Sequence, residues 1–207
     1  MSQTSEYSPE LLERAARIKL LLMDCDGVLS NGHIYFLPAP GGGLFETKTF
    51  DSQDGIALQW AHRAGIATGI ISGRTSPAVE ERARSAKMRY LYQGDTRKLP
   101  LLEEILADSG LPAAKVAYIG DDITDVPIMR RVGLAAAPSN SRAETLAAAN
   151  YVTPSPGGSG WTAGSARNSC ILGRASADPV SRRTRWPSPG PPRTQARRSG
   201  SWRPSSM

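Results

Sequence analysis

The stretch from residue 19 to residue 31, KLLLMDCDGVLSN, limits the possible folds more than any other part of the chain. Its apolar residues 20–23 end abruptly in the letters DCDG at residues 24–27. An apolar run of this length before a turn predicts a strand buried on both faces of a parallel sheet. Asp24 and Asp26 would then lie just beyond the core, where an open α/β sheet forms its ligand crevice. They could share a cation there, and Gly27 would let the backbone approach a bound anion closely.

Three further polar clusters follow apolar segments downstream. Residues 66–71 end in Ser72, residues 90–92 precede Lys98, and residues 116–119 end in the letters GDDITD. Strands that alternate with helices at this spacing predict a parallel sheet with helices on both faces. The carboxyl ends of parallel strands share one edge of the sheet. We therefore expect one site to hold the polar side chains of these clusters: Asp24, Asp26, Ser72, Lys98, Asp121 and Asp125.

The remaining segments fill in this α/β architecture. Two strand-like pieces, residues 33–36 and 44–50, flank a turn rich in Pro and Gly and predict a projecting hairpin. Helices are expected at residues 9–16, from Pro77, from residue 98 to Gly110 and through residues 128 and 129. Ile56, Trp60 and Ala64 recur at helical spacing and predict a helix, with Trp60, like Met129, in the core. Ser141 and Glu144 have the spacing of a capping box for the last helix.

The positive charge of the chain is concentrated at its C-terminal end. Of the 25 basic and 19 acidic residues, nine arginines and one acid lie from Trp161 onward, which gives the tail +8 and the first 160 residues −2. The net charge of +6 therefore gives no support to nucleic-acid binding by the body of the protein. No apolar run approaches the roughly 18–20 residues that cross a bilayer, and no end resembles a signal peptide. The two cysteines form no disulfide framework, so we expect a cytoplasmic location without membrane partners.

Composition divides the chain into a folded domain, residues 1–160, and a tail, residues 161–207, that is rich in Arg, Pro, Ser and Gly. The tail has too little apolar content to fold alone and is predicted to be disordered. One hypothesis makes it a binder of nucleic acid or acidic surfaces, because Trp186 and Trp202 lie among its arginines. The other makes it the product of out-of-frame translation of a GC-rich gene, which its lack of lysine favours.

The order of the polar clusters resembles the haloacid dehalogenase superfamily of phosphohydrolases: DxDG, then Ser or Thr, then Lys, then GDDxxD. Within it, the chain is similar to the small, cap-less branch typified by the 3-deoxy-D-manno-octulosonate 8-phosphate phosphatases. The matching segments are DCDGVLSNGHIYF, ISGRTSPAVEERA, YQGDTRKL, GDDITDVPIM and YVTPSPGG. The likeness runs from about residue 18 to residue 160. It implies a three-layer Rossmann-like fold with a central parallel sheet, a projecting β-hairpin and no cap domain.

The resemblance also implies a mechanism. Asp24 would be the nucleophile that forms an aspartyl-phosphate, and Asp26 would act as general acid and then as general base. Mg²⁺ would be held by the carboxylates of Asp24 and Asp121 and by the backbone carbonyl of Asp26. Ser72 and Lys98 would hold the phosphoryl oxygens. The supporting residues that it implies are Gly27, Gly73, Asp122 and Asp125.

The implied substrate is a sugar-acid phosphate. Arg74 favours 3-deoxy-D-manno-octulosonate 8-phosphate, because a bidentate guanidinium suits a sugar carboxylate. Asp54 and Arg82 are further candidates for substrate binding, and a neighbouring subunit could supply Arg82. Relatives without a cap use the hairpin to build a homotetramer whose subunits help to cover each site. The chain departs from its relatives at His33, where Arg is expected, at Ser72, where many have Thr, and from residue 161 onward.

Other functions stay open at the level of sequence. The substrate could instead be a nine-carbon, sialic-acid-like sugar phosphate or another sugar phosphate. A different class of function is a binding or scaffold protein on an inactive domain, with the basic tail as its contact surface. The complete set of Asp24, Asp26, Ser72, Lys98 and Asp121 favours the Mg²⁺-dependent phosphatase, because a scaffold has no need of all five.

Overall fold

The computed structural model describes residues 7–160 and 193–194. Its main sheet is parallel, with the strand order β8-β7-β6-β1-β4-β5-β9. The strands are β1 (Leu20–Met23), β4 (Ala67–Ser72), β5 (Tyr90–Gln93), β6 (Val116–Ile119), β7 (Leu134–Ala137), β8 (Tyr151–Val152) and β9 (Arg193–Thr194). Apart from β9, the predictions made for the tail from residue 161 to residue 207 lie outside the described residues. The predicted α/β class with a parallel sheet is confirmed.

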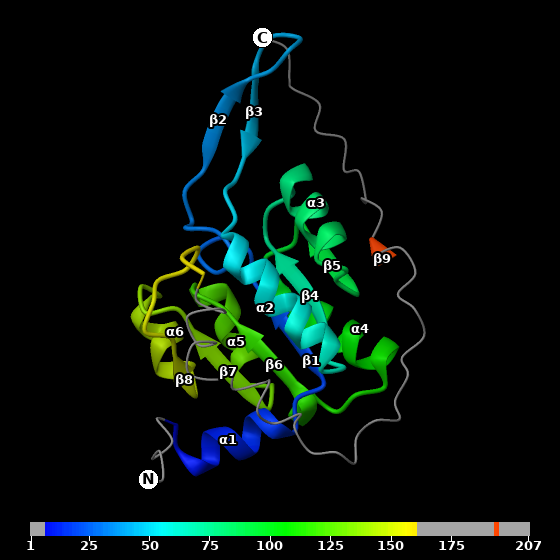
Figure 1. The fold of residues 1–207 in the computed structure, drawn as a ribbon, viewed down its shortest axis with the longest axis vertical. Coiled ribbons are helices and arrows are strands. Elements are labelled where there is room, and N and C mark those ends of the chain that lie inside the picture. The colour runs from blue at the N-terminus through cyan, green and yellow to red at the C-terminus, as the bar shows by residue number, and fades with distance from the viewer. Residues whose placement is uncertain (1–6, 161–192, 195–207) are drawn as a thin grey trace, which may run out of the picture.

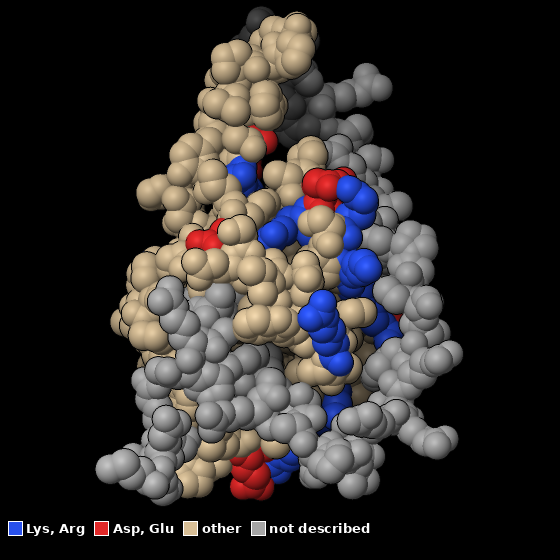
Figure 2. All heavy atoms as spheres, in the orientation of Figure 1, with Lys and Arg blue, Asp and Glu red and all other residues tan. Residues whose placement is uncertain are grey.

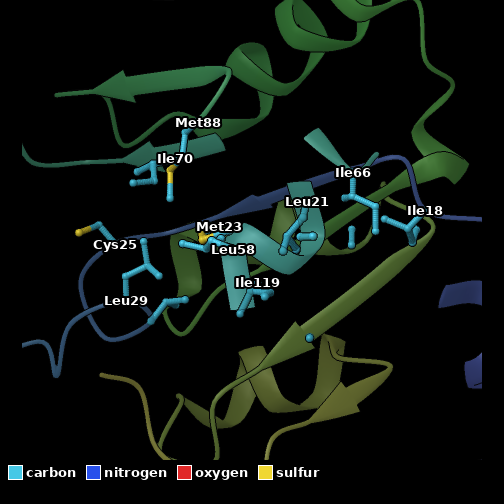
Figure 3. Close-up of a cluster of buried hydrophobic side chains, with 14 of the residues drawn as sticks. Ile18, Leu21, Met23, Cys25, Leu29, Leu58, Ile66, Ile70, Met88 and Ile119 are labelled. Atoms are coloured by element: carbon cyan, nitrogen blue, oxygen red, sulfur yellow. The ribbon is translucent and has the colours of Figure 1, made fainter. Parts of the chain in front are cut away.

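Strand β1 lies in the middle of the sheet and faces a separate core on each side. Leu21 and Met23 pack into one cluster of buried side chains, and Leu20 and Leu22 pack into the other. Figure 3 shows the first cluster, in which Leu21 and Met23 lie among side chains from the neighbouring strands and from α2. Because both faces of β1 are buried, the strand appears in the sequence as an unbroken apolar run.

Helices cover both faces of the sheet, which gives three layers (Figure 1). The first core cluster contains side chains of α1, α2 and α3, and the second contains side chains of α4, α5 and α6. The helices are α1 (Pro9–Ala16), α2 (Ser52–Arg63), α3 (Pro77–Ser85), α4 (Lys98–Ser109), α5 (Val126–Met129) and α6 (Ala143–Ala148), with short 3-10 turns η1 (Ala113–Lys115) and η2 (Ile123–Asp125). None of these helices has the length and apolar character required to cross a membrane.

A two-stranded antiparallel hairpin, β2 (Tyr35–Pro38) and β3 (Leu44–Thr47), projects from the body of the domain (Figure 1). It follows the loop after β1. Six of the hairpin's large apolar side chains are exposed: Ile34, Tyr35, Phe36, Leu37, Leu44 and Phe45. Figure 2 shows the outer part of the hairpin as a projection of uncharged atoms, with charged atoms near its base.

Two sequence predictions about helices are wrong in detail. The helix α2 begins at Ser52, and its buried residues are Asp54 and the small or aliphatic side chains after it rather than Trp60, which is 42% exposed. The predicted capping box of α6 does not form: its N-cap residue is Arg142, and the Ser141 hydroxyl instead donates to the carbonyl oxygen of Pro138. The prediction that Met129 lies in the core is confirmed.

The strand order reverses at β1, because the chain moves from β1 to β4 and β5 on one side and returns to β6, β7 and β8 on the other. Ligands of open α/β sheets bind outside the carboxyl ends of the strands at such a reversal.

Residues 157 and 158 pack against the loop that follows β1. The Gly158 amide donates to the carbonyl oxygen of Val28 at 2.9 Å, and any side chain at Gly157 would overlap the carbonyl oxygen of Gly27.

Candidate active site

Asp24 is the first residue after β1 and is held against the neighbouring strand. Its backbone amide donates to the carbonyl oxygen of Ile119, the last residue of β6, at 2.9 Å. Its side chain is nearly buried, and its Oδ1 accepts from the backbone amide of Cys25 at 2.6 Å. The carboxylate is therefore fixed at the carboxyl edge of the sheet, where the sequence predicts it.

Lys98 bridges two of the predicted carboxylates. Its Nζ lies 2.6 Å from Oδ2 of Asp24 and 2.6 Å from Oδ1 of Asp125, and its side chain is almost completely buried. Burial alone would lower the pKa of Lys98, but the two carboxylates outweigh that effect and raise it. Lys98 is also the first residue of α4, so helix and sheet together set its position.

Asp125 accepts hydrogen bonds at both of its carboxylate oxygens. Oδ1 accepts from Lys98 and from the Tyr118 hydroxyl, each at 2.6 Å, and Oδ2 accepts from the backbone amides of Asp121 and Asp122 at 3.0 and 3.1 Å. The side chain is fully buried. Because its oxygens accept hydrogen bonds from all of these donors, Asp125 organises the loop after β6 and orients Lys98.

Asp121 differs from Asp125 because one of its oxygens is unsatisfied. Its Oδ1 is buried and accepts no hydrogen bond from any described residue. Gly27, which has φ +79°, faces this carboxylate so closely that any side chain at position 27 would overlap Oδ2 of Asp121. Burial, reinforced by the charges of Asp24 and Asp125, raises the pKa of Asp121 to about 7. Burial likewise raises the pKa of Asp24 to about 6, although Lys98 opposes the shift.

These carboxylates fit a divalent cation. Asp24, Asp121 and Asp125 can each offer an oxygen, and the three oxygens lie within 4.8 Å of one another. Asp125 is the weakest ligand of the three because its oxygens already accept from four donors. The buried, unsatisfied oxygen of Asp121 and the raised pKa values of Asp24 and Asp121 fit a site whose carboxylates would be stabilised by a bound cation.

Asp26 is paired with a lysine that the sequence analysis did not identify. Nζ of Lys48 lies 2.6 Å from Oδ1 and 2.7 Å from Oδ2 of Asp26, and the Lys48 side chain is fully buried. Lys48 directly follows β3, so the base of the hairpin supplies this contact. A single lysine after a short strand belongs to no motif, and its role depends on a contact across 22 residues of chain.

Ser72 is the last residue of β4 and Arg74 follows that strand, next to the loop after β1. Ser72 is buried, and its Oγ accepts from the backbone amide of Arg74 at 3.3 Å. The Arg74 guanidinium donates to Oε2 of Glu46 on β3 at 2.5 Å. This hydrogen bond is the largest cause of the lowered pKa of Glu46 and of the raised pKa of Arg74.

The other predicted residues lie around this centre in structural roles. Arg82 donates to the backbone carbonyl of Asp51, the N-cap residue of α2, at 2.9 Å. Asp54 is fully buried in the first turn of α2. Asp122 caps η2 by accepting from the amide of Ile123, and Gly73 allows close packing against Thr96. The role of Arg82 and Asp54 in substrate binding stays a prediction.

Cys25 lies between the two aspartates and is completely buried. Burial, followed by the negative charge of Asp26, raises the pKa of its thiol to about 12. The thiolate form that reacts with electrophiles is therefore nearly absent near neutral pH. Cys25 fills space between functional groups.

Comparison with known proteins decides the family. A model of the haloacid dehalogenase-like hydrolases matches residues 83–160. The 3-deoxy-D-manno-octulosonate 8-phosphate phosphatase KdsC of Salmonella typhimurium is 37% identical over 153 residues, which cover 74% of this chain and 79% of the relative. The corresponding phosphatase of Yersinia pestis is 39% identical over 157 residues, which cover 74% and 82%. The chain belongs to the 3-deoxy-D-manno-octulosonate 8-phosphate phosphatase family.

Solved structures of this family have the same fold. The phosphatase from Moraxella catarrhalis, in complex with a magnesium ion, a phosphate ion and a KDO molecule, aligns with a TM-score of 0.73 at 35% identity and covers 82% of this chain and 93% of its own. The Yersinia pestis phosphatase aligns with a TM-score of 0.74 at 35% identity, with 82% and 88% covered. Membership in this phosphatase family makes the chain a phosphatase of the haloacid dehalogenase type.

Proposed function

We propose that this chain hydrolyses the phosphate monoester of a sugar acid, 3-deoxy-D-manno-octulosonate 8-phosphate, as a step in making a lipopolysaccharide precursor. The observation that carries the proposal is the position of Asp24: it is buried at the edge of the sheet, with Lys98 at 2.6 Å on one oxygen. Asp121, with its unsatisfied oxygen, lies in the same cluster. Family membership supports the substrate, because the named relatives are phosphatases of this compound.

Mg²⁺ is the cation that fits. Carboxylates of Asp24 and Asp121 and the backbone carbonyl of Asp26 would hold it, in an all-oxygen environment that suits a hard cation. A bound Mg²⁺ would neutralise negative charge on the phosphate and so lower its repulsion of an anionic nucleophile. The magnesium ion in the Moraxella catarrhalis phosphatase supports this choice.

The reaction proceeds in two steps on the residues of this chain. First, an oxygen of Asp24 attacks phosphorus, the ester P–O bond breaks, and Asp26 gives its proton to the departing sugar oxygen. Asp24 is then an aspartyl-phosphate and Asp26 is ionised. Second, water attacks phosphorus, Asp26 takes the proton of that water, and phosphate leaves, which restores both side chains.

Two groups hold the phosphoryl oxygens during both steps. The Lys98 ammonium stabilises the charge that develops on them, and Asp125 keeps Lys98 in place. The Ser72 hydroxyl donates the second contact. Ser72 lies next to Asp24 because β4 and β1 are paired, with Met23 opposite Ile70. Asp122, Gly27 and Gly73 support the loops that carry these groups.

Arg74 recognises the carboxylate of the sugar acid in this proposal. Its side chain is half exposed at the base of the hairpin, where it is paired with Glu46. Arg74 favours the octulosonate over nine-carbon acids, and Asp54 and Arg82 are secondary candidates for contacts with the sugar.

We propose further that the hairpins assemble four copies of the chain. An isolated two-stranded hairpin is marginally stable, and the exposed apolar side chains on its outer part are typical of an interaction surface. The catalytic domain is residues 1–160. Cys25, a free cysteine inside the site, supports a cytoplasmic location.

The test is release of inorganic phosphate from a panel of sugar phosphates, with and without Mg²⁺. We expect the highest kcat/KM with 3-deoxy-D-manno-octulosonate 8-phosphate and no turnover in the presence of a chelator. The variant Asp24→Asn should lose about 10⁴-fold or more in kcat, because an amide cannot be phosphorylated. Circular dichroism and the melting curve serve as the folding control. Near-native turnover by a folded Asp24→Asn protein would remove Asp24 as the nucleophile.

A further inference from the structure

Four charged side chains form a continuous chain from the base of the hairpin to the loop after β1. Arg74 donates to Oε2 of Glu46 at 2.5 Å, Oε1 of Glu46 lies 3.8 Å from Nζ of Lys48, and Lys48 contacts both oxygens of Asp26 at 2.6 and 2.7 Å. The outer two residues are the proposed contact with the substrate carboxylate and the proposed general acid. The inner two, Glu46 and Lys48, have no part in the mechanism given above.

The link between Glu46 and Lys48 is incomplete in a specific way. Oε1 of Glu46 is buried and accepts no hydrogen bond from any described residue, although the nearest ammonium is only 3.8 Å away. The Lys48 side chain has no exposure to solvent, so its charge can be satisfied only by neighbouring groups. A small movement of Nζ would exchange an oxygen of Asp26 for the unsatisfied oxygen of Glu46.

This exchange would determine whether Asp26 has an oxygen free to approach the substrate. A carboxyl group that donates to a leaving oxygen needs one oxygen free to approach the substrate. Both oxygens of Asp26 lie within hydrogen-bonding distance of Lys48. Lys48 therefore orients the carboxyl group of Asp26 but also occupies both of its oxygens.

We propose that Lys48 is a positioning residue for Asp26 and that Glu46 makes its position depend on what Arg74 binds. A carboxylate of the substrate takes the place of Glu46 on Arg74. The released Glu46 carboxylate then attracts the Lys48 ammonium, which frees one oxygen of Asp26 for the leaving group. Recognition of the sugar acid and readiness of Asp26 are thereby coupled, and the substrate acid affects kcat as well as KM. This inference rests on the proposed function.

A purely structural role is the competing explanation. Lys48 and Glu46 could simply attach the hairpin to the body of the domain, since both lie at its base. In that case their removal would weaken the fold and slow all substrates equally. The two explanations predict different losses of kcat when the leaving group is changed and when Asp26 is removed.

The first experiment compares Lys48→Met with wild type on an alkyl ester and an aryl ester. Hydrolysis of a sugar phosphate needs a proton on the leaving oxygen, whereas p-nitrophenolate leaves readily without one. We expect kcat to fall about 10²-fold for the sugar phosphate and less than about threefold for p-nitrophenyl phosphate. In an Asp26→Ala background the substitution of Lys48 should have no further effect on the sugar phosphate. Lys115→Met, on the exposed 3-10 turn η1, is the matched control.

The second experiment uses Glu46→Gln, which removes one charge and keeps the shape of a partly exposed side chain. With an acidic sugar phosphate, kcat should fall about tenfold while KM stays the same or falls, because Arg74 no longer has a competing carboxylate. With glucose 6-phosphate, which has no carboxylate, neither constant should change by more than about twofold. Equal losses on both sugars, or a rise of KM alone, would overturn the coupling.

The outcomes separate this inference from the function on which it rests. A wild-type protein that hydrolyses none of these esters overturns the proposed function and the inference together. An active wild type in which Lys48→Met slows both ester classes equally, or adds its effect to that of Asp26→Ala, overturns the inference alone. Lys48→Met that fails to fold leaves the Glu46→Gln experiment to decide.

Discussion

At the scale of single residues, the aspartates of the site differ in what their oxygens already accept. Asp125 accepts from four donors, Asp26 accepts from Lys48 and from the Ser30 hydroxyl, and Asp121 keeps one buried oxygen unsatisfied. Identical functional groups are thus suited to different tasks by their hydrogen-bond partners. Asp125 is a scaffold, whereas Asp121 has the free lone pairs that a cation needs.

Gly27 tests this division of roles, because its lack of a side chain makes room for Asp121. The variant Gly27→Ala would overlap Oδ2 of Asp121 and place a non-glycine residue at φ +79°. We expect the affinity for Mg²⁺, measured by calorimetric titration, to fall about tenfold or more, the equivalent of at least about 1.4 kcal/mol. Gly41→Ala in the hairpin turn, where a side chain meets nothing within 4 Å, is the control and should bind Mg²⁺ normally. Unchanged affinity in Gly27→Ala would contradict the assignment of Asp121 as a ligand.

At the scale of elements, the strands of the main sheet could be predicted closely from the sequence and the helix faces could not. A strand buried on both sides is an apolar run with clear ends, so residues 20–23 and 116–119 were located to the residue. The inward face of α2 instead carries Asp54 and small side chains, while Trp60 is directed toward solvent. Hydrophobic spacing alone cannot show that a helix packs through its small residues.

The same contrast holds for the site. The residues after the carboxyl ends of the strands could be grouped from sequence, because parallel strands end at one edge. Lys48 and Glu46 could not be added, because their position depends on the path of the hairpin back across the loop after β1. An isolated lysine after a short strand has no spacing that indicates its partner.

The hairpin carries its own prediction. Phe36 and Leu44 are 59% and 69% exposed on its two strands, and their replacement by Ser would make the surface polar. We expect wild type to elute as a tetramer, and Phe36→Ser with Leu44→Ser to elute as a monomer of unchanged circular dichroism. Light scattering coupled to size exclusion gives the masses. Ile56→Ser, on the exposed face of α2, is the control and should stay tetrameric. A tetrameric double variant would exclude the hairpin as the main interface.

At the scale of the whole molecule, the buried acids make stability depend on pH. The folded-state pKa values of Asp24 and Asp121 are raised from 3.8 to about 6 and about 7, with burial as the main cause. The folded state therefore binds these protons more tightly than the unfolded chain does. The stabilisation that these bound protons give to the folded state is complete below pH 4 and is lost as the pH rises through 6 and 7.

We therefore expect the Mg²⁺-free protein to melt at a lower temperature at pH 8 than at pH 5. The shift of Asp24 alone corresponds to about 3 kcal/mol, or a fall of roughly 6–12 °C. Mg²⁺ should raise the melting temperature more at pH 8 than at pH 5, because it binds the ionised carboxylates. Differential scanning calorimetry at the two pH values measures these melting temperatures. The variant Asp121→Asn should show a smaller dependence of the melting temperature on pH. A metal-free protein that is more stable at pH 8 would contradict the assignment.

The tail gives a second prediction at this scale. Every residue proposed for catalysis or metal binding lies between positions 24 and 125, and the two glycines that pack on the active-site loop lie at 157 and 158. A chain that ends at Gly160 loses only the two-residue strand β9 from the described structure. We expect it to fold and to keep kcat within about twofold of the full chain, with a melting temperature changed by a few degrees at most. A loss of turnover that exceeds tenfold would show that the tail contributes to catalysis.

The packing of Gly157 and Gly158 on the loop after β1 has a consequence for biosynthesis. A ribosome makes Gly157, which completes this packing, 130 residues after Gly27 of the acidic motif. At translation rates of about 5–20 residues per second, the interval is roughly 7–26 seconds. Throughout that interval the nascent chain carries aspartates whose loop has not yet been enclosed. We therefore expect the loop that carries Asp24 to reach its packed arrangement only after Gly157 and Gly158 have been made.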